Sequence, residues 1–164
     1  NHLIKTGCKK IALFSSIDNL SVGKLRAKGF YQAIEAKGLK ADENLIVLAE
    51  TADDFDAKVA GFFDKNKVDA VFALDEHASV IAMKLGIKKG LKIPEGLSVI
   101  GFADGVWSRR LTPSLSTVSQ HGPEIGEVAT KMLIEKLESK EEIYNHKTTI
   151  VKTELRQRES TKKI

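Results

Sequence analysis

Residues 70–102 read AVFALDEHASVIAMKLGIKKGLKIPEGLSVIGF, and this stretch decides the expected fold. It begins with a short apolar run over 70–74 and ends with another over 97–102, each of the length of a buried strand. Between them, residues 76–89 carry apolar side chains at helical spacing and stop before Gly90, a residue type common just after a helix. Strands that are apolar along their whole length and separated by a helix are typical of a parallel sheet covered on both faces.

The same alternation precedes this stretch. Apolar runs over 10–15 and 44–49 predict two further strands, and helical spacing over about 22–37 and 53–65 predicts the helices that follow them. Because crossovers between parallel strands are right-handed, the four strands predict a doubly wound α/β unit.

The pattern changes after Phe102. We expect a polar loop over 103–113, a short extended piece over 116–120, an amphipathic helix over 123–138 and a β-rich segment over 148–155. The helix is apolar enough to need a partner surface, which the four-stranded unit does not obviously supply. It is therefore expected to belong to another lobe.

Composition narrows the class of protein. The chain has 164 residues, of which 42% are hydrophobic and 29% charged, which suits one folded domain or one lobe of a larger protein rather than a disordered chain. No apolar run approaches the roughly 18–20 residues of a membrane span. The lone Cys8 excludes an internal disulfide, and the dispersed net charge of +4 shows no nucleic-acid footprint.

Polar residues follow each predicted strand, and ligands of open parallel sheets bind beyond those carboxyl ends. Carboxylates accept pairs of hydroxyl protons and a guanidinium donates in a fork, so this set suits a polyhydroxylated ligand. Trp107 could cover an apolar sugar face. The candidate ligand residues are Ser15, Asp18, Arg26, Asp75, Asp104 and Trp107.

Motifs for catalysis are absent from the sequence. There is no Gly-rich dinucleotide turn, no P-loop and no nucleophile elbow, and the four histidines show no metal-ligand spacing. We therefore expect no catalytic residue, no metal and no cofactor.

The predicted helix over 76–89 carries two apolar stripes. One can cover the sheet, which leaves the offset stripe of Val80, Met83 and Ile87 to be buried by something else. Either the helix is wedged deeply into its own domain, or this stripe is a subunit interface.

Several stretches together resemble the effector-binding, periplasmic-binding-protein-like region of LacI/GalR-type bacterial transcription regulators. Their order and spacing run across essentially the whole chain. They are HLIKTGCKKIA over 2–12, RAKGF over 26–30, DAVFA over 69–73, GLKIPE over 90–95, SVIGF over 98–102, PSLSTVSQ over 113–120, IG over 125–126 and REST over 158–161.

The resemblance implies a two-lobed effector domain that dimerises and follows an N-terminal DNA-binding domain, here absent. Residues 8–122 and 147–164 would form the second lobe. Residues 1–7 and 123–146 would be crossing elements that belong to a truncated first lobe. Contact with DNA would come only through the missing domain.

The resemblance also implies roles for single residues. Arg26 matches the arginine that holds the ligand, and Asp75 stands where an asparagine is usual. Ala103 occupies the place of a ligand-binding aspartate, with Asp104 one residue late, so Asp104 would substitute only through a shifted loop. Leu111 ends a loop that would join Val80, Met83 and Ile87 in the dimer interface.

The resulting hypothesis is a cytoplasmic, homodimeric sensor that binds a small polar effector, a saccharide in the first instance, between two lobes. It controls operator binding allosterically and needs no covalent chemistry. Two alternatives stay open: an exported sugar receptor of a transporter, and a magnesium-dependent phosphohydrolase that uses Asp75 or Asp104.

Overall fold

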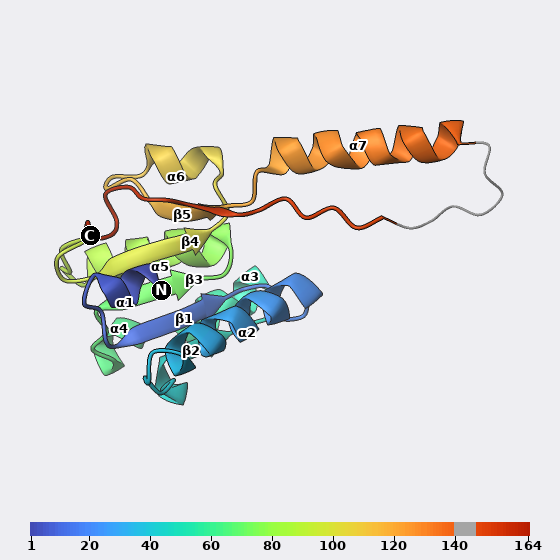
Figure 1. Ribbon diagram of the computed structural model, residues 1–164. Coiled ribbons are helices and arrows are strands. Elements are labelled where there is room, and N and C mark those ends of the chain that lie inside the picture. Colours follow the sequence, from blue (N-terminus) through green and yellow to red (C-terminus); the bar gives the residue numbers. More distant parts are fainter. Residues whose placement is uncertain (140–146) are drawn as a thin grey trace.

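The computed structural model describes residues 1–139 and 147–164, and its centre is a six-stranded sheet (Figure 1). The sheet order is β2-β1-β3-β4-β5-β6, with the first five strands parallel and β6 antiparallel to β5. This confirms the doubly wound parallel sheet. The strands are β1 Ile11–Ser15, β2 Ile46–Leu48, β3 Ala70–Ala73, β4 Ser98–Phe102, β5 Ser116–Ser119 and β6 Glu154–Arg156.

Helices cover the sheet on both sides because side chains alternate along each strand. In β1, Ala12 and Phe14 face the core beneath α3, α4 and α5, whereas Ile11 and Leu13 face α1 and α2. The helices are α1 His2–Lys5, α2 Ser21–Glu35, α3 Ala52–Val59, α4 Phe62–Lys65, α5 Glu76–Lys88, α6 Val106–Arg110 and α7 Gly122–Glu138, with a 3₁₀ turn η1 at Glu43–Leu45.

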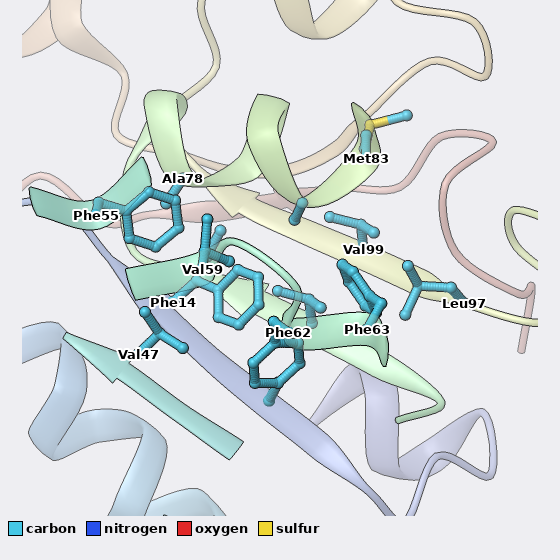
Figure 2. Close-up of a cluster of buried hydrophobic side chains, with 14 of the residues drawn as sticks. Phe14, Val47, Phe55, Val59, Phe62, Phe63, Ala78, Met83, Leu97 and Val99 are labelled. Carbon is cyan, nitrogen blue, oxygen red and sulfur yellow. The ribbon is translucent and has the colours of Figure 1, made fainter. Parts of the chain in front are cut away.

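An aromatic cluster fills the first of these two cores (Figure 2). Phe14 packs edge-to-face on Phe62, with ring centroids 4.9 Å apart, and also contacts Phe55 and Phe63. Such contacts add to the burial of the large rings. The cluster joins the central strand β1 to α3 and α4, and so fixes the helices against the sheet.

Three expected elements differ in detail. The helix expected over 53–65 is two helices, because Gly61 takes a left-handed φ of +69° that an α-helix does not allow. The loop expected over 103–113 contains α6. The strand expected over 148–155 is formed only at Glu154–Arg156, where the chain pairs with β5.

The two segments expected to belong to the first lobe behave differently. Leu3 of α1 is 5% exposed and packs with Ile11, Phe30 and Ile100, so placing residues 1–7 outside this lobe does not fit the packing. By contrast, α7 buries none of its residues and runs away from the sheet (Figure 1). Residues 140–146 of the expected crossing segment lie outside the described residues.

Within the described ranges, no helix combines the length and the hydropathy that crossing a bilayer requires.

Candidate functional site

Arg26 joins the carboxyl ends of three neighbouring strands. It projects from α2, and one guanidinium nitrogen donates to the Leu74 carbonyl just after β3, at 2.7 Å. The other terminal nitrogen donates to Oε1 of Gln120 just after β5, at 2.9 Å. The guanidinium carbon lies 4.0 Å from the ring centroid of Phe102, the last residue of β4, in a cation–π contact. Burial lowers the pKa of Arg26, and the charge of Asp75 opposes that shift.

A hollow of about 770 Å³ opens beside Arg26, on the face of the sheet that α1 and α2 flank. Its lining is mostly apolar and includes Phe30, Phe72 and Ile100, together with the polar side chains of Arg26 and Gln120. An apolar wall suits the packing of apolar side chains better than a polyhydroxylated ligand, which needs convergent polar groups. We therefore place the candidate ligand site at the polar end of this hollow, along the strand ends.

Asp75 is 8% exposed and holds the ends of β1 and β3 together. Its carboxylate accepts from the backbone N–H of Ser16 at 2.8 Å and from the Ser16 hydroxyl at 2.9 Å. It also accepts from the backbone N–H of Ala78 at 2.8 Å, which makes Asp75 the N-cap of α5. Both oxygens of Asp75 are therefore engaged by donors inside the lobe.

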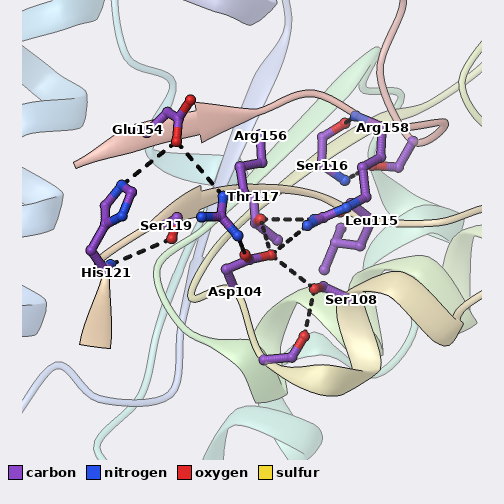
Figure 3. Close-up of polar contacts among 12 residues, drawn as sticks. Asp104, Ser108, Leu115, Ser116, Thr117, Ser119, His121, Glu154, Arg156 and Arg158 are labelled. Atoms are coloured by element: carbon purple, nitrogen blue, oxygen red, sulfur yellow. Dashed lines mark hydrogen bonds and ion pairs between the residues drawn. The ribbon is translucent and has the colours of Figure 1, made fainter. Parts of the chain in front are cut away.

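Asp104 lies at the centre of a polar cluster (Figure 3) and also lines a second hollow, of about 570 Å³, together with Gln120. Its side chain is 6% exposed and accepts from Arg158 at 2.6 Å and from Arg156 at 2.5 Å. The hydroxyls of Thr117 and Ser108 donate to the same carboxylate, at 2.9 and 3.2 Å. The cluster ties the loop after β4 to β5 and to the C-terminal segment, so these contacts oppose the expected ligand contact of Asp104.

These contacts make the stability of the lobe depend on acid pH. Burial alone would raise the pKa of Asp104, but the hydrogen bonds from Arg158 and Thr117 and the charge of Arg158 outweigh it and lower the pKa from 3.8 to about 2. Because the folded pKa lies below the unfolded one, the contribution is complete above about pH 4 and is lost as pH falls toward 2. We expect a loss of about 2 kcal/mol of unfolding free energy across that window.

Urea unfolding at pH 5 and pH 2.5 measures this loss. The Asp104→Asn variant lacks the titrating group, so its unfolding free energy should fall by about 2 kcal/mol less than that of the wild type over the same interval. Equal pH dependence in the two proteins would contradict the ion-paired arrangement.

The remaining predicted ligand residues lie in different surroundings. Ser15 is fully buried, and its hydroxyl accepts from the backbone of Ile17, so it does not reach a ligand. Asp18 is half-buried at the end of β1. Trp107 is 61% exposed on α6. It lines neither the hollow beside Arg26 nor the second hollow, which Gln120 and Asp104 line.

Gln120 and Phe102 were not among the predicted site residues, although both contact Arg26. The available signal was positional. Each residue stands at or directly after the carboxyl end of an expected strand, as the other candidates do.

The expected interface stripe is only partly exposed. Met83 is 2% exposed and packs in the core with Ala82 and Val99, so its assignment to an exposed stripe is wrong. It points inward because α5 is wedged against both β3 and β4 and buries more than one stripe. Ile87 is 49% exposed, and Leu111 packs partly buried against the same core.

Among residues 1–139 and 147–164, no group of histidine, cysteine or acidic side chains is arranged to hold a metal ion. The fold is therefore that of an α/β lobe whose mostly parallel sheet carries an arginine across the carboxyl ends of three strands.

Comparison with known proteins agrees with that class. Residues 1–161 match the family described as the periplasmic binding protein-like domain. The chain is 32% identical to the HTH-type transcriptional regulator DegA of Bacillus subtilis (strain 168) over 126 residues, 76% of this chain and 37% of that protein. It is 31% identical to the ribose operon repressor of Halalkalibacterium halodurans over 165 residues, 98% of this chain and 48% of that protein.

Solved structures show the same relationship. The fold superimposes on the transcriptional regulator CelR in its cellobiose complex with a TM-score of 0.85 and 27% identity, over 96% of this chain and 48% of that chain. A LacI-family regulator from Sanguibacter keddieii gives a TM-score of 0.86 at 28% identity, over 97% of this chain and 60% of that one. The chain belongs to the periplasmic-binding-protein-like domain family, in the form found in LacI-type transcriptional regulators. It spans about half the length of the curated relatives it matches.

Proposed function

We propose that this lobe is half of the effector-binding clamp of a LacI-type regulator, and that it binds a small polar effector at its strand ends without transforming it. The observation that carries the proposal is Arg26, which draws together the ends of β3, β4 and β5. Relatives named as regulators and the cellobiose complex of CelR support a saccharide or a similar molecule.

In this proposal, Arg26 and Gln120 contact the effector, and Asp18, which follows β1 at the same edge of the sheet, is a further candidate contact. Asp75 and Asp104 hold the site together from within instead of touching the effector. The first lobe, to which α7 would belong, supplies the opposite wall. Closure of the two lobes on the effector favours one arrangement of the protein, and so one operator affinity.

The remaining parts of the proposal follow from the relatives. The regulator would be cytoplasmic, would read DNA through a domain outside this chain, and would form a homodimer. Val80 and Ile87 of α5, with Val106 and Trp107 of α6, are the apolar side chains that we propose for the subunit contact.

Arg26→Ala tests the effector site. In the full-length regulator, we expect this variant to lose at least about tenfold in effector response, because a charge-assisted fork is removed from the centre of the site. Operator binding without effector should be unchanged, since Arg26 makes its contacts at the strand ends of this lobe and the proposed DNA-reading domain lies outside this chain. Operator affinity is measured with and without effector by fluorescence anisotropy.

Lys28→Ala, an exposed change on the same helix, is the matched control. An Arg26→Ala protein that responds to effector as well as the control does would remove the basis of the proposal.

A further inference from the structure

Among the described residues, three contacts hold the guanidinium of Arg26, and one of them acts on its face. The two terminal nitrogens donate to the Leu74 carbonyl at 2.7 Å and to Oε1 of Gln120 at 2.9 Å. The guanidinium carbon lies over the ring of Phe102, 4.0 Å from its centroid. Because the N–H donors lie in the guanidinium plane, two hydrogen bonds still allow that plane to tilt about the line that joins the two nitrogens. The Phe102 ring limits this tilt by closing one face.

The sheet fixes where the Phe102 ring lies. Phe102 is the last residue of β4 and pairs with Val118 of β5. Side chains alternate along a strand, so Phe102 points to the same side of the sheet as Ile100, which packs in the core that α1 and α2 cover. The ring is therefore presented to α2, the helix that carries Arg26.

A phenyl ring is suited to holding this cation because it takes up no donor. A guanidinium has five N–H groups, and a carboxylate or amide oxygen at position 102 would accept from some of them. The face of the ring attracts the cation through its quadrupole and leaves those donors for other partners. Burial lowers the pKa of Arg26, so this half-buried cation has lost part of its hydration, and cation–π contacts are strongest under that condition.

Phe72 shows what an aromatic side chain does on the same surface when it packs against apolar groups. It lies on the neighbouring strand β3, pairs with Ile100 and lines the same hollow as Phe102. Its ring stacks on Phe30 of α2, with the centroids 6.3 Å apart and 16° between the planes. Phe72 thus packs helix against sheet, whereas Phe102 packs against a charge at the proposed effector site.

We propose that Phe102 is a positioning residue of the effector site: its ring holds the Arg26 guanidinium in the orientation that meets the effector, and it does not itself touch the effector. The inference rests on the proposed function and adds the residue through which Arg26 is oriented. It predicts that Phe102 affects effector binding only while Arg26 is present.

Chemical modification of Arg26 tests the orientation without an effector. Phenylglyoxal adds to guanidinium groups, and peptide mass spectrometry on the full-length regulator gives the rate at Arg26. We expect Phe102→Leu to raise that rate at least about threefold, because the face that the ring covers becomes open. Phe102→Tyr keeps the ring and should restore the slow rate. Phe72→Leu removes a ring from the same hollow and, as the matched control, should leave the rate unchanged.

Sugar binding tests whether the contact serves the effector site. Glucose, galactose, ribose and cellobiose are titrated into the wild-type regulator with its operator, and the sugar that changes operator affinity most becomes the probe. Phe102→Leu should weaken binding of this sugar about three- to tenfold, the fold-change that corresponds to a cation–π contact of a half-buried cation. Phe102→Tyr should bind it as the wild type does. In the Arg26→Ala background, adding Phe102→Leu should change binding by less than about twofold.

The outcomes separate the inference from the proposed function. An unchanged modification rate in Phe102→Leu overturns the positioning role. A loss of sugar binding that is as large in the Arg26→Ala background as in the wild type also overturns it, because Phe102 would then touch the sugar itself. If Arg26→Ala weakens sugar binding and Phe102→Leu does not, the proposed function stands and the positioning role fails.

If no sugar changes operator affinity, the proposed function and the inference both fail. Phe102→Met is measured in the same way as Phe102→Leu, so that a leucine variant that does not fold still leaves a protein without the ring. Circular dichroism checks that each variant is folded before its modification rate and sugar binding are compared.

Discussion

Replacing Arg158 with methionine is expected to lower the free energy of unfolding by about 3–5 kcal/mol, the range found when one partner of a buried ion pair is removed. The Arg158 side chain is only 15% exposed and donates to Asp104, to the Leu115 carbonyl at 2.7 Å and to the Thr117 hydroxyl at 2.9 Å. Methionine keeps most of the apolar stem, so the loss reports mainly the charge and the three hydrogen bonds. Urea unfolding followed by circular dichroism measures it.

Arg156→Met is the matched control, because Arg156 contacts the same carboxylate from an exposed strand. Its side chain is 40% exposed, and exposed ion pairs contribute about 0–1 kcal/mol. We therefore expect the Arg158 variant to be destabilised at least about 2 kcal/mol more than the Arg156 variant. Equal losses of unfolding free energy in the two variants would mean that Arg158 is as well solvated as Arg156 and that its ion pair with Asp104 is not buried.

The sheet could be predicted from the sequence because each strand is marked by a short apolar run, which can be recognised without knowing what the strand contacts. The four strands expected between residues 10 and 102 are mostly buried, so each is apolar along most of its length and stands out from the helices. The short α6 was missed for the opposite reason. Its five residues span little more than one turn and include exposed Val106 and Trp107, so it has no apolar stripe to detect.

The site was harder to predict because it depends on contacts between distant residues. Arg26 could be identified from its place in the first helix and from the family resemblance. Asp104 could not be separated from a ligand residue, because the arginine that neutralises it lies 54 residues further along the chain. Gln120 gains its role in the same way, through a contact with Arg26 from 94 residues away.

For helix α5, the spacing of apolar residues could not show which apolar side chains are buried and which are exposed. Two apolar stripes on one helix are compatible with a subunit interface and with deep burial, and the choice depends on how much of the helix the sheet covers. Because α5 packs on both β3 and β4, the sheet reaches Met83 but leaves Ile87 outside.

Met83→Glu is therefore expected to prevent stable folding, with a loss of more than about 4 kcal/mol, instead of producing a folded monomer. A carboxylate at this position would lie unpaired in the core beside Ala82 and Val99. Ile87→Glu places the same group on the same helix at a side chain that is 49% exposed. That variant should change unfolding by less than about 1 kcal/mol and should weaken self-association.

Thermal unfolding and sedimentation velocity on the two variants distinguish these outcomes. A Met83→Glu protein that folds normally and sediments as a monomer, beside an Ile87→Glu protein that remains dimeric, would reverse the assignment and restore Met83 to the interface. Loss of the unfolding transition in the Met83 variant alone, with dimer dissociation in the Ile87 variant alone, would place Met83 in the core and Ile87, one turn further along the same face of α5, in the contact surface.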